Sequence, residues 1–189
     1  MPSRHSVLRQ RIIAAAIDAT VRSGWSSVTM GGLADSVGVS RQTVYNEVGS
    51  KPSLAEAMVA HELAGFLGLV EQAFDAHPDD AVAAVEDATC AVLSRAQRNS
   101  LLRAIVSASY GADTELLPLL TTNSTALLEA ASTVVAAALR VRAPHLSEQR
   151  VAMATDVIVR TVLSHVMQPS GTPERTAEDI SGATALLLR

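Results

Sequence analysis

The stretch from Thr29 to Lys51 decides the fold, and it reads TMGGLADSVGVSRQTVYNEVGSK. Within it, Ala34, Gly38 and Val44 stand at the spacing that two short, crossing helices require. Ala34 provides a small side chain at the crossing, and Gly38 can adopt the left-handed conformation of a tight turn. Val44 can then bury the second helix against the first. This spacing predicts a helix-turn-helix, and a surface helical hairpin with polar decoration is the alternative that it leaves open.

The second of these short helices has a polar face that suits DNA. When Val44 and Val48 face inward, the helical period turns Gln42, Thr43 and Asn46 outward. Arginine can pair with guanine in the major groove, and glutamine or asparagine can pair with adenine. The residues predicted to bind DNA are Thr29, Ser40, Arg41, Gln42, Thr43, Tyr45, Asn46 and Lys51.

The rest of the chain is also patterned for helices. Of its 189 residues, 48% are apolar but only 3% are aromatic, which favours helices packed through small aliphatic side chains. The predicted class is all-α, with about nine helices and no strand. The expected helices cover residues 6–22, 30–37, 41–48, 52–76, 79–99, 101–109, 123–141, 147–167 and 173–188, with a further turn of helix at 115–120. Residues 1–51 are predicted to form the DNA-binding domain and 52–189 a second helical domain, to which the family resemblance described below assigns effector binding and dimerisation.

Charge is divided unevenly between the two predicted domains. Residues 1–51 carry six basic and three acidic side chains, a net charge of +3, whereas 52–189 carry nine basic and sixteen acidic ones, a net charge of −7. A basic head on an acidic body is typical of a separate DNA-binding domain. Surface charge unrelated to DNA is the alternative.

Several other classes of protein find little support. The most apolar stretch, 130–139, is about half the roughly 20 residues of a membrane-spanning helix, so no membrane segment is expected. The single cysteine, Cys90, excludes an internal disulfide and fits a cytoplasmic protein. The five histidines form no close pair on one helix face, and no phosphate-binding loop or nucleophile elbow occurs, so we expect no metal, no cofactor and no enzyme activity.

The motifs around the turn resemble the DNA-binding head of TetR-family regulators. The resemblance covers about residues 9–54 and is carried by TMGGLA at 29–34, GVSRQTVY at 38–45 and SKPSL at 50–54. It implies an all-α homodimer whose first three helices bind an operator, while the C-terminal helices bind an effector and dimerise. It further implies phosphate contacts for Thr29, Thr43, Tyr45 and Lys51. It places Arg41, Gln42 and Asn46 nearest the bases.

Two features depart from the family pattern. The family often has His-Phe where this chain has Glu47 and Val48, and a glutamate facing DNA would repel phosphate. Gly31 and Gly32 also weaken the first motif helix, each by about 1 kcal/mol relative to alanine.

The C-terminal part is unusually aliphatic, and the family resemblance implies a cavity within it. Such a cavity, with few aromatic walls, suits a flexible alkyl chain better than a planar drug. The run VYNEVGSK at 44–51 resembles TetR-type regulators associated with alkane and fatty-acid metabolism. The residues predicted to line the effector site are Phe66, Leu69, Val70, Phe74, Leu93, Leu101, Ile105, Leu127, Val134, Met153 and Val157, although for any one of them an ordinary core position is the alternative.

The last two helices carry apolar stripes that suit a four-helix dimer interface. The residues predicted to form it are Ala152, Ile158, Val162, Val166, Ile180, Ala183 and Leu187.

Together these patterns predict a ligand-responsive repressor with DNA, a second copy of itself and a lipophilic effector as partners. Two other classes remain as alternatives. One is an all-α lipid-binding or carrier protein without an operator, and the other is an enzyme that uses the aliphatic pocket. The spacing of Ala34, Gly38 and Val44 argues against both.

Overall fold

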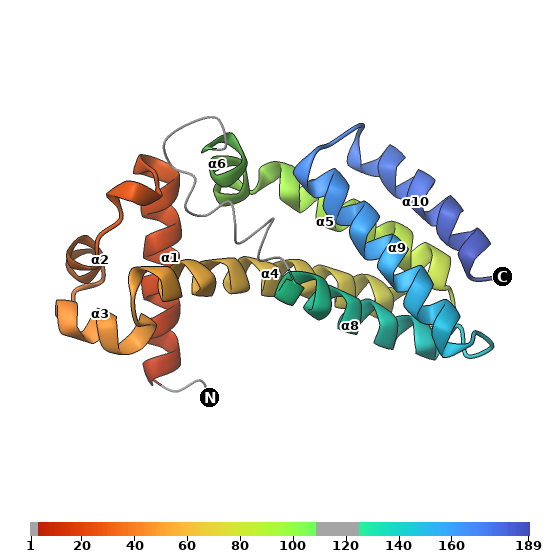
Figure 1. Cartoon of the computed structure of the whole chain (residues 1–189), viewed down its shortest axis with the longest axis horizontal. Coiled ribbons are helices and arrows are strands. Elements are labelled where there is room, and N and C mark those ends of the chain that lie inside the picture. The colour runs from red at the N-terminus through yellow and green to blue at the C-terminus, as the bar shows by residue number, and fades with distance from the viewer. Residues whose placement is uncertain (1–3, 109–124) are drawn as a thin grey trace. The chain divides into compact units, whose positions relative to one another are not determined.

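The computed structural model describes residues 4–108 and 125–189, with side chains for 5–104 and 125–189. Every regular element in these residues is a helix, which confirms the predicted all-α class (Figure 1). The predicted turn of helix at 115–120 lies outside the described residues. The elements are α1 (Arg4–Ser23), the 3-10 helix η1 (Trp25–Ser27), α2 (Met30–Val37), α3 (Arg41–Val48), α4 (Lys51–Ala76), α5 (Ala81–Arg98), α6 (Ser100–Ala108), α8 (Thr125–Arg142), α9 (Glu148–Met167) and α10 (Pro173–Leu187).

Hydroxyl side chains cap at least four of the described helices, and one of them is Ser147 at the start of α9. The Oγ1 atom of Thr29 accepts the backbone N–H of Gly32 at 3.1 Å and so caps α2. Ser40 caps α3 in the same way, accepting from the N–H of Thr43 at 3.1 Å. Thr172 caps α10, where Pro173 follows at a position that needs no N–H donor.

The chain divides into two compact units, and the first holds more than the predicted head. Its described parts are residues 4–63 and 100–108. Leu54 and Met58 of α4 and Leu101 of α6 are buried in one core with Ile12 and Trp25. This unit therefore differs from the predicted domain of residues 1–51, because the apolar face of α4 continues the core past the helix-turn-helix.

The second unit is a helical bundle made from residues 64–99 and 125–189. Its core joins the C-terminal half of α4 to α5, α8, α9 and α10 (Figure 1). Small residues such as Ala84 and Ala88 on α5 and Ala177 on α10 are buried, so α5 and α10 can pack closely. Ser181 of α10 donates to a carboxylate oxygen of Glu86 at 2.7 Å and satisfies a polar group at the edge of this contact.

Helix α4 was overlooked in the expectation that no segment could span a membrane. Its 26 residues include a window with a mean hydropathy of 1.3, so by length and composition alone the helix could cross a membrane. The same composition is typical of a core helix, and α4 provides Leu54 and Met58 to the first core and Phe74 to the second. It is the one such helix among the described residues.

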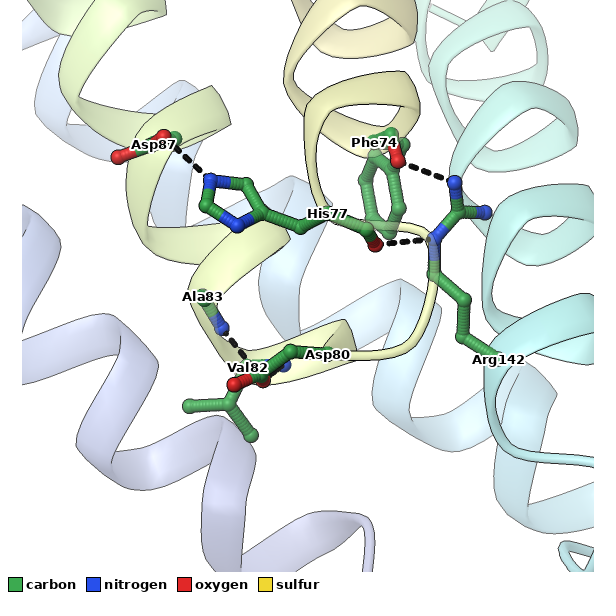
Figure 2. A network of polar contacts seen from close by, with 7 residues as sticks. All are labelled: Phe74, His77, Asp80, Val82, Ala83, Asp87 and Arg142. Carbon is green, nitrogen blue, oxygen red and sulfur yellow. Dashed lines mark hydrogen bonds and ion pairs between the residues drawn. The ribbon is translucent and has the colours of Figure 1, made fainter.

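Arg142, the last residue of α8, fixes the C-terminal end of α4 (Figure 2). Its Nε donates to the carbonyl of His77 at 2.9 Å, and its Nη2 donates to the carbonyl of Phe74. The guanidinium also lies 5.0 Å from the centroid of the Phe74 ring. These bonds satisfy carbonyls that the end of a helix leaves without intrahelical donors. Beyond this point Asp80 caps α5, and His77 contacts Asp87 of α5 at 2.6 Å.

Two glycines, Gly31 within α2 and Gly38 in the turn that follows it, provide a matched pair of substitutions. Gly38 has φ of 74°, a conformation that a side chain disfavours, so Gly38→Ala is expected to lower the free energy of unfolding by about 1 kcal/mol or more. Gly31 is helical and a Cβ there meets nothing within 4 Å, so Gly31→Ala is expected to raise it by about 1 kcal/mol. Urea unfolding followed by circular dichroism measures both. Equal effects of the two substitutions would contradict the assigned turn.

Candidate DNA interface

The turn that joins α2 to α3 is built as the sequence predicts. Gly38 is left-handed, with φ 74° and ψ 40°, and its N–H donates to the carbonyl of Ala34 at 2.9 Å. The N–H of Val39 reaches the same carbonyl at 3.0 Å, so the last turn of α2 is closed. Val44 of α3 is fully buried and Val48 nearly so. The opposite face of α3 is therefore turned to solvent.

Two amide side chains stand on the solvent face of α3. Gln42 and Asn46 are both exposed, and the Nε2 of Gln42 donates to the Oδ1 of Asn46 at 3.0 Å. This bond joins residues one helical turn apart and orients both amides. The sequence predicted that these residues face outward, and the structure brings them together.

Arg41 and Tyr45 form a second pair on the flank of α3. The guanidinium of Arg41 lies 5.5 Å from the centroid of the Tyr45 ring, and its Nη2 donates to the phenol oxygen at 3.3 Å. Both side chains are exposed. A cation and a hydroxyl held together in this way suit a phosphate oxygen.

The hydroxyl groups predicted to contact DNA take part in local hydrogen bonds at the starts of α2 and α3. Thr29 uses its oxygen as an acceptor for Gly32, which leaves the hydroxyl proton for another partner. The hydroxyls of Ser40 and Thr43 lie 2.8 Å apart, so one of them donates to the other. These hydroxyl groups lie at the starts of α2 and α3, where free backbone N–H groups also favour anions.

Lys51, the first residue of α4, is anchored to the 3-10 helix. Its Nζ lies 4.8 Å from the centroid of the Trp25 ring and donates to the carbonyl of Ser26 at 3.3 Å. The buried indole thus positions a cation at the start of α4. Sequence reasoning missed the contact between Trp25 and Lys51, because the two residues are 26 positions apart.

Glu47 is turned toward α1. Its carboxylate lies 2.6 Å from the Nδ1 of His5, its side chain is 9% exposed, and its backbone carbonyl accepts a bond from Arg9. The repulsion of phosphate that the sequence suggested applies only to a carboxylate facing DNA, and this one faces a histidine. No local signal could have found His5 and Arg9, which lie about 40 positions away in the sequence.

The residues predicted to line the effector site are distributed over several environments. Phe74 and Leu93 are buried in the second unit. The half-buried members on α4 and α8 are Phe66, Leu69, Val70, Leu127 and Val134.

Three members of that set do not fit an interior wall of the second unit. Leu101 belongs to the core of the first unit, because α6 packs against α1. Met153 and Val157 are 46% and 42% exposed on α9. The side chain of Ile105 lies outside the described ones.

The residues predicted to form the dimer interface fall into two groups, some buried in the core and some accessible to solvent. Ile158 and Ile180 are 5% and 7% exposed and are committed to the core of the second unit. Those left accessible are Ala152 and Ala183, which are exposed, and Val162, Val166 and Leu187, which are half-buried. Sequence reasoning missed Leu186, which is exposed on α10, and it placed Met153 and Val157 inside. A dense aliphatic stripe does not reveal which of its edges faces solvent.

Comparison with known proteins agrees with this geometry. Residues 12–58 match the family described as bacterial regulatory proteins, tetR family, and residues 80–185 match the bacterial tetracyclin repressor C-terminal domain. The chain therefore belongs to the TetR family of bacterial transcriptional regulators.

Individual relatives extend the comparison. The HTH-type transcriptional regulator AlkX of Mycobacterium tuberculosis is 26% identical over 176 residues, which are 93% of this chain and 82% of that protein. The crystal structure of the TetR family repressor AlkX from Dietzia sp., implicated in biodegradation of n-alkanes, superposes with a TM-score of 0.76 at 27% identity, over 94% of this chain and 96% of that one. The fatty acid degradation regulator FadR of Bacillus halodurans shares the fold, with a TM-score of 0.57 at 14% identity over 95% and 97% of the two chains.

Proposed function

We propose that this protein is a ligand-responsive repressor that binds an inverted-repeat operator as a homodimer in the cytoplasm and is released by a lipophilic effector. The observation that carries the proposal is the face of α3. This face carries two exposed amides and an arginine paired with a tyrosine. The capped N-termini of α2 and α3 lie beside it, and the turn at Gly38 joins the two helices. A recognition helix in the major groove requires such a face.

The dimer places two copies of α3 on one duplex. Successive half-sites on one side of DNA lie about 34 Å apart, so a two-fold dimer matches an inverted repeat. On α9 and α10 the apolar side chains left in solvent include Met153, Val157 and Leu186, with the small Ala152 and Ala183 beside them. The matching helices of a second copy would cover these side chains in a four-helix interface.

The effector class is supported by two lines. The half-buried side chains of α4 and α8 in the second unit are almost entirely aliphatic. The predicted site has two aromatic residues, the half-buried Phe66 and the buried Phe74. The AlkX repressor from Dietzia, at 27% identity, is implicated in n-alkane biodegradation. An alkyl-chain effector that binds the released dimer better than the operator-bound one would lower DNA affinity by that difference.

Operator binding is tested by substitutions on the two parts of the interface. Lys51→Ala and Tyr45→Ala are expected to weaken binding to all duplexes, and Lys51→Ala to lower the slope of log Kd against log salt by about 1. Gln42→Ala is expected instead to change which sequence is preferred. Fluorescence anisotropy at several salt concentrations measures these effects, with Gln97→Ala on the exposed face of α5 as control. An affinity that depends neither on salt concentration nor on DNA sequence would contradict the proposal.

The dimer face is tested on α9. Val157→Lys places a charge in the proposed interface and is expected to give monomers in sedimentation velocity, with helix content unchanged by circular dichroism. Val141→Lys is the matched control, because Val141 is more exposed and lies on α8. If both variants remain dimeric, the interface lies elsewhere.

The effector class is tested with defined probes. Hexadecane and palmitate are expected to raise the melting temperature and to release a bound operator, whereas the planar anthracene is expected to do neither. Thermal unfolding and anisotropy with labelled operator give the two readings. Release by anthracene alone would overturn the alkyl assignment. Alkyl binding by a chain that recognises no operator would instead identify a lipid-binding or carrier protein.

A further inference from the structure

The centre of the solvent face of α3 is occupied by two neutral amides. Gln42 and Asn46 stand one turn apart, opposite the buried Val44 and Val48. The hydrogen bond from Nε2 of Gln42 to Oδ1 of Asn46, at 3.0 Å, fixes which end of each amide is used inside the pair. The Oε1 of Gln42 and the Nδ2 amino group of Asn46 take no part in this bond, so both remain for a third partner.

The bond inside the pair uses one N–H of Gln42 and one lone pair of Asn46. Gln42 keeps its Oε1 and its second N–H, and Asn46 keeps its Nδ2 amino group and the second lone pair of Oδ1. Of these groups, the Oε1 of Gln42 is an acceptor that only a donor on the base can satisfy. The major-groove edge of adenine offers the complement, a donor at N6 and an acceptor at N7. Guanine offers acceptors at both N7 and O6, so the Oε1 of Gln42 would meet O6 without a proton between them. Cytosine and thymine have no N7 and can satisfy only one of the two groups.

The charged residues of α3 do not compete for this central position. Arg41 is the only basic residue of the helix, and it lies over Tyr45 on the flank. Glu47 is the only acidic one, and its carboxylate contacts His5 of α1. The centre of the solvent face of α3 is thus neutral, and the charged side chains of the helix lie away from it.

We propose that the Gln42–Asn46 amide pair reads an adenine within each half-site and discriminates against guanine there. This inference rests on the proposed function, since it requires that α3 enter the major groove. It makes the pair a specificity determinant that acts as one unit. Loss of either amide removes the orientation of the other.

The test begins with the operator that the full-length wild-type protein selects from random duplexes. Each adenine of a half-site is then replaced by 7-deazaadenine, which lacks the N7 acceptor, or by purine, which lacks the N6 amino group. At one position both replacements are expected to weaken wild-type binding about 10-fold, within the range of one good bidentate contact. Guanine at that position is expected to weaken it at least as much.

The variants identify the pair as the reader. Gln42→Ala and Asn46→Ala are each expected to abolish the difference between adenine and 7-deazaadenine at that position. Thr43→Ala is the control on the same helix, and it is expected to weaken binding to both duplexes while keeping their ratio. A selected half-site with guanine under the pair, or 7-deaza sensitivity that persists in both amide variants, would overturn the inference while leaving operator binding intact. Failure to select any sequence would instead refute the proposed function.

Discussion

The close approach of α2 and α3 depends on the left-handed backbone of Gly38. With φ of 74°, Gly38 lets the chain reverse within a few residues and lets its own N–H and that of Val39 close the end of α2. The crossing then buries Ala34 and Val44 almost completely. Because Val44 is buried, the helical period determines which residues of α3 face solvent. The amide pair and the arginine–tyrosine pair on the outer face are both consequences of this one turn.

Local chemistry explains why much of this region could be predicted from the sequence. Turns and helix faces depend on residues within a few positions of each other, so the tight turn at Gly38 could be predicted. The solvent face of α3 followed from its two buried valines. The all-α class followed in the same way from periodicity and from prolines and glycines at the breaks.

Contacts between distant parts of the chain could not be predicted in this way. The pairing of Glu47 with His5 joins residues 42 positions apart, and no pattern in either segment indicates the other. The same limit explains Leu101, which packs in the first unit although α5, the helix just before it in the sequence, belongs to the second. On α9 the stripe is apolar on more than one face, so periodicity did not separate the buried Ile158 from the exposed Val157.

The hydrogen bonds of the Arg142 guanidinium affect the order in which parts of the chain can fold. It donates to carbonyls of Phe74 and His77, which precede it by 68 and 65 residues. A bond across such a separation forms only after the intervening chain has closed into a loop, which costs conformational entropy. While the protein is being synthesised, the carbonyls of Phe74 and His77 therefore lack this donor until α8 has emerged. The end of α4 thus gains this support late in synthesis, although its sequence is made before half of the protein is complete.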